Sequence, residues 1–167
     1  MACACSTGWS PAITRAETLA EVLFYHLMQM PLERVLPDLL ERSLQRGWRA
    51  VVQVGNEERL EPLNSVLWTY KDDSFLPHGT RADGPPEMQP VFLTAQDENP
   101  NAANVLFLVD GAPAGDLTPY ERVVLLFDGN NPEAVTKART DWQQIKAGGH
   151  EATYWQQSDQ GRWEKKA

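Results

Sequence analysis

The chain has 167 residues, 42% of them apolar, and six tryptophans, which is enough for one compact domain with a substantial core. Its formal net charge of −8 at pH 7 argues against non-specific binding to a nucleic-acid backbone, because such binding depends on Lys and Arg side chains that neutralise phosphates. The charge is uneven: over residues 137–167 basic side chains outnumber acidic ones six to four. This basic end on an acidic body suggests an acidic ligand.

The amino-terminal segment carries both cysteines, Cys3 and Cys5. One intervening residue makes a disulfide between them strained, and two thiols make an incomplete metal site. The rest of the chain has no cysteine, which fits a reducing, cytoplasmic location. Residues 1–19 contain neither a basic leader nor a long apolar run, so neither a signal peptide nor a membrane-spanning helix is expected. We interpret 1–19 as a disordered N-terminal extension and 20–167 as one domain.

The first half of this domain alternates strand and helix patterns. EVLFYHL, beginning at Glu21, predicts a buried strand, and the apolar spacing over residues 32–47 predicts a helix. We expect Pro37 in or near the first turn of that helix and Gly47 at its end. Residues 48–54 predict a second strand, and 56–68 a second helix capped by its first residue. The β-α-β-α order implies a parallel sheet with right-handed crossovers.

The second half adds three strands, a helix and a final hairpin. Residues 90–95, 104–110 and 122–128 predict strands, the last two almost continuously apolar, as expected for strands covered on both faces. Residues 132–147 predict a helix that starts after an Asn cap and ends before two glycines. In the closing residues, 150–166, the side chains alternate as they do in a strand, and a turn follows that predicts a terminal hairpin. The predicted architecture is a single Rossmann-like α/β domain, with a mostly parallel central sheet and helices on both faces.

This order of elements raises the possibility of a nucleotide-binding enzyme. Such enzymes place a glycine-rich turn after the first strand, whereas residues 26–31 contain no glycine. The glycine-rich loop 110–116 lacks a lysine, and its two flanking carboxylates would repel phosphate. The three histidines are dispersed, without the spacing of a metal site. We therefore expect no cofactor and no metal, and keep a Rossmann-like nucleotide-binding enzyme as an alternative.

The segment WTYKDDSFLPHG, residues 68–79, gathers polar side chains between two aromatic ones. Asp72 and Asp73 could act as acid and base, but adjacent residues in a loop usually point apart, which favours a solvated polar rim. Trp68 and Phe75 can present two flat apolar anchors to a partner, and Pro77 fixes the chain after them. The alternative is that these aromatics cover the edge of the sheet as part of the core.

Three segments together resemble one family. EVLFYHL through RGWRAVVQV, the run VLWTYKDDSFLPHG and the end AGGHEATYWQQSDQGRWEKK are similar to the chi subunit of bacterial DNA polymerase III, over about residues 20–167. The resemblance implies a non-catalytic accessory subunit on the clamp-loader side of the replicase, with no cofactor and only indirect contact with DNA. It implies that one face binds the psi subunit or another clamp-loader subunit and, in some bacteria, a helicase. The residues that match this face are Trp68, Phe75, Leu76, Pro77 and His78.

The resemblance also implies a site for the acidic C-terminal tail of single-stranded-DNA-binding protein on the helix 132–147. The matching residues are Lys137, Arg139, Trp142 and Lys146. An aromatic ring at the end of the tail could lie beside the apolar stripe, while the cations hold its carboxylates.

Two features qualify this second site. Gln143 and Gln144 stand where the family commonly has more Lys or Arg, so either the affinity is lower or the basic residues of the C-terminal hairpin contribute. Those residues are Arg162, Lys165 and Lys166. Alternatively, Trp142 belongs to the core and the cations form a solvated face. A free-standing nucleic-acid-binding module is the remaining alternative for the whole chain, and the net charge disfavours it.

Overall fold

The structure is a computed structural model that describes residues 21–28, 30–69, 77–112, 117, 119–160 and 162–166. The predicted N-terminal extension, residues 1–19, lies outside the described residues. The same holds for residues 70–76, which include Phe75 and Leu76 of the predicted partner face.

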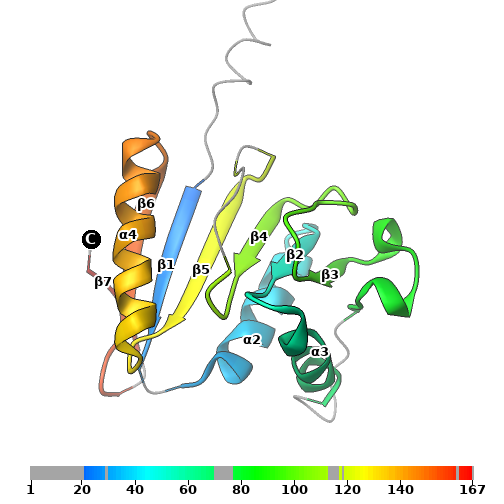
Figure 1. Ribbon diagram of the computed structural model, residues 1–167, viewed down its shortest axis with the longest axis horizontal. Coiled ribbons are helices and arrows are strands. Elements are labelled where there is room, and N and C mark those ends of the chain that lie inside the picture. Colours follow the sequence, from blue (N-terminus) through cyan, green and yellow to red (C-terminus); the bar gives the residue numbers. More distant parts are fainter. Residues whose placement is uncertain are drawn as a thin grey trace, which may run out of the picture.

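A single seven-stranded sheet forms the centre of the molecule (Figure 1). Its strands lie in the order β3-β2-β4-β5-β1-β6-β7, and every pairing is parallel except that of β6 with β7. The strands are β1 Glu21–Leu27, β2 Ala50–Gln53, β3 Val91–Thr94, β4 Val105–Leu108, β5 Arg122–Asp128, β6 Glu151–Gln157 and β7 Trp163–Lys165. The mostly parallel sheet and the closing hairpin are as predicted.

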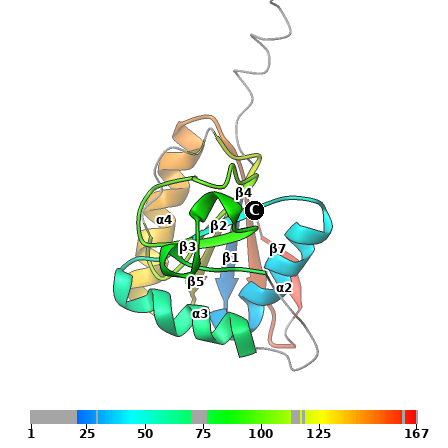
Figure 2. The same cartoon turned by 90° about the vertical axis from the view of Figure 1, so that its right-hand side faces the viewer.

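Helices cover both faces of this sheet, as Figure 2 shows for α2 and α4. Apolar residues of α2 (Leu32–Gln45) and α3 (Leu60–Thr69) pack on one face, and those of α4 (Pro132–Ala147) pack on the other. We call these the α2 face and the α4 face. Three short 3₁₀ turns, Glu57–Arg59, Arg81–Asp83 and Pro86–Met88, complete the described elements.

The core follows from the strand sequences. All residues of β2, β3 and β4 are buried, as are the five apolar residues of β5. Alternate residues of each strand point to opposite faces, so a strand covered on both sides must be apolar at every position. In β5, Val123 and Leu125 pack on the α4 face, and Val124 and Leu126 pack on the α2 face. The fold class predicted from the sequence is therefore confirmed.

Two local details refine the prediction. Pro37, expected in or near the first turn of α2, lies in the second turn, because the helix begins at Leu32 directly after Pro31. Pro37 is buried, and it has no N–H to donate to the carbonyl one turn earlier. Asn56 is a cap as predicted, but its side chain accepts from the backbone N–H of Arg59 and so caps a 3₁₀ turn that precedes α3.

Candidate partner-binding sites

Trp68 lies in the last turn of α3 and is 49% exposed. Its ring lies 4.5 Å from the ring of His78, measured between centroids, with the planes tilted by 48°. This exposure excludes the alternative that Trp68 is a core residue. A half-exposed indole supported from one side is the kind of group that partner surfaces use as an anchor.

His78 lies beneath this indole and not at the surface. It is buried, and its Nε2 is 3.2 Å from the backbone carbonyl oxygen of Asn64 in α3. Pro77, directly before it, is partly buried. The structure therefore brings Trp68, Pro77 and His78 together, with His78 as the support for Trp68. Phe75 and Leu76 lie outside the described residues, so their predicted place beside Trp68 stays a prediction.

Trp142 on α4 is partly buried against the sheet. Its ring meets that of Phe24 edge-on at 5.3 Å and that of Tyr154 edge-on at 5.9 Å, between centroids. The Nζ of Lys146, one turn later, lies 5.5 Å from the centre of the indole. Trp142 is thus packed on the core at one edge and has a cation beside its ring, and its predicted role in tail binding stays a prediction.

Arg139 is exposed, and within the described part of the chain it has no hydrogen bond or ion pair to another side chain. Its charge nevertheless acts on two groups below it. Burial lowers the pKa of His26, and Arg139 lowers it further, while Arg139 opposes the rise that burial causes in the pKa of Tyr154. The His26 Nδ1 and the Tyr154 hydroxyl oxygen are 2.6 Å apart. Arg139 therefore lies over a hydrogen-bonded His–Tyr pair with its guanidinium available to a ligand.

Sequence reasoning missed this pair, because 128 residues separate its two members. The parallel pairing of β1 with β6, which places Phe24 opposite Tyr154, brings them together. The sequence signal for this pair was limited to the alternation of side chains along β6, which places Ala152, Tyr154 and Gln156 on one face of the strand.

Lys137 faces a different part of the molecule from Arg139. Its Nζ donates to the Asp141 carboxylate at 2.8 Å and to the Ala112 carbonyl at 3.3 Å. Two positions along a helix correspond to a rotation of about 200°, so Lys137 and Arg139 point to nearly opposite sides of α4. The structure therefore groups Arg139, Trp142 and Lys146 but separates Lys137 from them.

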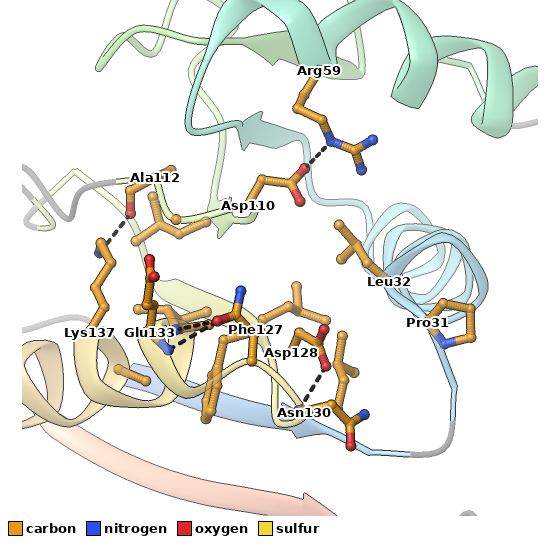
Figure 3. A pocket seen from close by; sticks show the side chains of 18 of the residues that line it. Pro31, Leu32, Arg59, Asp110, Ala112, Phe127, Asp128, Asn130, Glu133 and Lys137 are labelled. Atoms are coloured by element: carbon orange, nitrogen blue, oxygen red, sulfur yellow. Dashed lines mark hydrogen bonds and ion pairs between the residues drawn. The ribbon is translucent and has the colours of Figure 1, made fainter.

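A pocket of about 850 Å³ opens beside the carboxyl ends of β4, β5 and β1 (Figure 3). After β1 the chain continues to α2 on one face of the sheet, and after β5 it continues to α4 on the other face. Open α/β sheets commonly bind ligands where the connections of neighbouring strands diverge to opposite faces in this way. Arg59 reaches this pocket from the 3₁₀ turn before α3. Its Nε donates to Asp110 at 2.9 Å (Figure 3). Its Nη2 donates to Glu33 at 3.1 Å. These carboxylates, Asp110 foremost, raise the pKa of Arg59.

The charge of the pocket does not favour a nucleotide. The cations that line it in the described part of the chain are Arg59 and Lys137, and each is already engaged by carboxylates of the protein. Among the described residues, five carboxylates line the pocket and would repel phosphate, namely Glu33, Asp110, Asp128, Glu133 and Asp141. Among the described residues there is also no group of three His, Cys, Asp or Glu side chains that could hold a metal ion.

Comparison with known proteins identifies the family. Residues 19–153 match the family described as DNA polymerase III chi subunit, HolC. The chain belongs to this family. A curated relative, "Probable DNA polymerase III subunit chi" from Rickettsia prowazekii (strain Madrid E), is 27% identical over 103 residues, which are 62% of this chain and 62% of that relative.

The chi family match spans both sites described above and ends within β6. It includes Trp68 of α3 and Arg139 of α4, whereas β7 and the basic residues around it lie beyond the matched range. In the described part of the chain, no helix combines the length and apolar character needed to cross a lipid bilayer.

Proposed function

We propose that this chain is a non-catalytic accessory subunit of the DNA polymerase III holoenzyme in DNA replication. In this role it bridges the clamp loader, through the psi subunit or an equivalent subunit, to the acidic C-terminal tail of single-stranded-DNA-binding protein. A helicase is a further candidate for the same face as the psi subunit. Family membership supports the general role, and the arrangement of the two candidate sites supports the bridging.

The observation that carries the bridging role is the separation of the two sites. Trp68 lies on α3, which packs on the α2 face, and Arg139 lies on α4, which covers the α4 face. Two ligands bound at these places would have the sheet between them. A protein that binds two partners on opposite faces can hold both at once, as a bridging subunit must.

The α4 site has the chemistry that an acidic tail with an aromatic end requires. The guanidinium of Arg139 can hold a carboxylate with two parallel hydrogen bonds. The partly buried ring of Trp142 offers an apolar surface beside it, and Lys146 adds a second cation over that ring. His26 is held largely neutral at pH 7 by burial, so it adds little charge beneath Arg139.

Calorimetric titration with a peptide that ends in several Asp residues and a C-terminal Phe tests this site. We expect binding at low salt that weakens toward physiological salt, as the screening length falls from about 30 Å to about 8 Å. Arg139→Ala should weaken binding about tenfold, the size expected for loss of a charge-assisted contact. Amidating the peptide's terminal carboxylate should weaken binding by about the same factor. If the two changes remove the same contact, combining them should weaken binding little further.

Lys137→Ala is the matched control on the same helix, because Lys137 is engaged by Asp141 on the other side of α4. It should change peptide affinity less than about twofold. Absence of binding at low salt, or equal effects of the Arg139 and Lys137 substitutions, would remove the α4 site. The proposal of a bridging subunit would then lose one of its two partners.

A further inference from the structure

A second concentration of positive charge lies on the α2 face, away from the α4 site. It consists of Arg42 and Arg46 near the end of α2, Trp48 after the helix, and Arg122 at the start of β5. We call these four residues the Arg–Trp patch. The Arg46 guanidinium carbon lies 4.3 Å from the centre of the Trp48 ring, and that of Arg122 lies 5.3 Å from it. Because Glu21 already pairs with Arg122, the exposed Arg42 and Arg46 are the cations that the patch offers to a ligand.

The fold builds this patch from segments that are distant in the sequence. Gly47 adopts a φ of +82°, which turns the chain back so that the Trp48 N–H donates to the Ser43 carbonyl. This turn places the indole beside Arg46. Arg122 arrives from β5 on the same face of the sheet, where its Nε also donates to Glu21 of β1 at 2.9 Å.

Arg42 and Arg122 also act on a common neighbour, Tyr25 of β1. Burial raises the pKa of Tyr25, and the charges of Arg122 and Arg42 oppose that rise. Tyr25 in turn packs against Trp163 of β7, with centroids 4.9 Å apart. The arginines therefore border an aromatic surface that is only partly buried.

The Trp48 ring contacts two guanidinium groups. That of Arg122 already donates to Glu21, so the ring can orient only Arg46 toward a ligand. A guanidinium held over an aromatic ring keeps its N–H groups free at the edge of its plane, where it can grip a carboxylate or phosphate. Arg42 and Arg46 are exposed, and they are four residues apart on α2, so they project from the same side of the helix. The patch thus offers several oriented donors in a small area with apolar surface beside them.

We propose that the Arg–Trp patch binds an acidic segment from within a partner protein chain, in which carboxylates alternate with apolar side chains. The carboxylates meet Arg42 and Arg46, and the apolar side chains lie along Tyr25 and Trp163. Arg122, which already pairs with Glu21, contacts the Trp48 ring. Binding at this patch does not require the C-terminus of the partner chain. This site is independent of the proposed α4 site, because it lies on the opposite face of the sheet and uses different residues.

Two observations favour a peptide over a nucleic acid. The Trp48 ring is already covered by guanidinium groups, so it is not a free platform for base stacking. The helix α2 also carries Asp38 and Glu41 close to Arg42, and these repel a continuous phosphate backbone, whereas discrete carboxylates of a peptide can avoid them.

The test is a titration of the full chain with a fluorescent eight-residue peptide of alternating Glu and Leu, acetylated at one end and amidated at the other. Because its carboxyl terminus is blocked, this probe lacks the terminal carboxylate expected for the α4 site. Fluorescence anisotropy should show saturable, salt-sensitive binding. Arg46→Gln should weaken it about fivefold, and Arg46→Lys should recover only part of that loss, because lysine keeps the charge but not the planar fork.

Arg34→Gln is the matched control, since Arg34 is an exposed arginine near the other end of α2. Arg34→Gln should leave the affinity for the Glu–Leu peptide within about twofold of the wild-type value, and so should Arg139→Ala. Circular dichroism on each variant establishes that it is folded. The proposal is overturned by absence of binding at low salt, by equal effects of Arg34→Gln and Arg46→Gln, or by loss of binding in Arg139→Ala.

A competing titration with oligo(dT) separates the two kinds of polyanion. The proposal expects oligo(dT) to bind more weakly than the peptide. Tighter binding of oligo(dT), weakened by Arg46→Gln, would assign the patch to nucleic acid and contradict the proposal. None of these outcomes depends on the peptide titration of the α4 site, so each site can fail without the other.

Discussion

Trp68 and Trp142 are both tryptophans on helices that pack against the sheet, but their surroundings differ. Trp68 is 49% exposed and rests on one buried ring, that of His78. Trp142 is wedged edge-on against Phe24 and Tyr154. The same residue type is therefore half exposed in one place and packed against two other aromatic rings in another. The difference should appear when each is truncated.

The largest effect should come from Trp142→Ala. This change removes a partly buried indole from the α4 face and leaves a cavity beside Phe24 and Tyr154. We expect a loss of about 2 kcal/mol in the free energy of unfolding, below the 3–5 kcal/mol typical of fully buried aromatics. Urea denaturation followed by circular dichroism measures it.

Trp68→Ala is the comparison for that measurement. Because half of the Trp68 surface is already in water, its truncation should cost less than about 1 kcal/mol of folding stability. If the two variants lose equal stability, or if Trp68→Ala loses more, the distinction between anchor and core at these two positions is wrong.

The contribution of His26, on the α4 face, to folding stability should depend on pH. Burial lowers the pKa of His26 below its usual 6.5, so the unfolded chain binds a proton there more readily than the folded one. The contribution of His26 to the free energy of unfolding is fully present above about pH 6.5. It is lost as the pH falls through 6.5 toward the lowered pKa of His26 in the folded protein. His26→Gln removes the titration, so the stability advantage of the wild type should shrink between pH 7.5 and 5.5. Parallel stability curves for the two proteins would contradict this assignment.

The smallest effect should come from Lys146→Ala at the α4 site. Its Nζ lies 5.5 Å from the centre of the Trp142 ring and is exposed, so its contribution to tail binding should be about 0.5 kcal/mol, or roughly twofold in affinity. Calorimetry with the acidic peptide measures this. An effect as large as that of Arg139→Ala would show that charge alone, and not a specific guanidinium contact, holds the peptide.

The fold was largely predictable because its strands are coded locally. The continuous apolar runs that became β4 and β5 are typical of strands covered on both faces. Gly47 and Asn131 mark helix ends through local backbone chemistry. Pro37 was predicted in or near the first turn because a proline is easiest to accommodate there, and the structure places it, buried, in the second turn.

The candidate sites were less predictable because tertiary contacts decide them. Lys137 and Arg139 were both predicted to contribute to one site, although helix geometry turns positions two apart to nearly opposite sides. No local pattern joins His26 to Tyr154, or Arg122 to Trp48, since these contacts exist only once the sheet has formed. The exposure of Trp68 likewise depends on His78, which packs against it from beyond the end of α3.

The most direct test of the bridging role is quantitative capture of partners from a native lysate of the source organism. Wild-type protein, Trp68→Ala and Arg139→Ala are compared, with the captured proteins identified by mass spectrometry. We predict reciprocal losses: Trp68→Ala loses the clamp-loader or helicase partner and keeps the single-stranded-DNA-binding protein, and Arg139→Ala does the reverse. Loss of the same partners in both variants, or of neither partner in either, would contradict the account of two separate sites on opposite faces of the sheet.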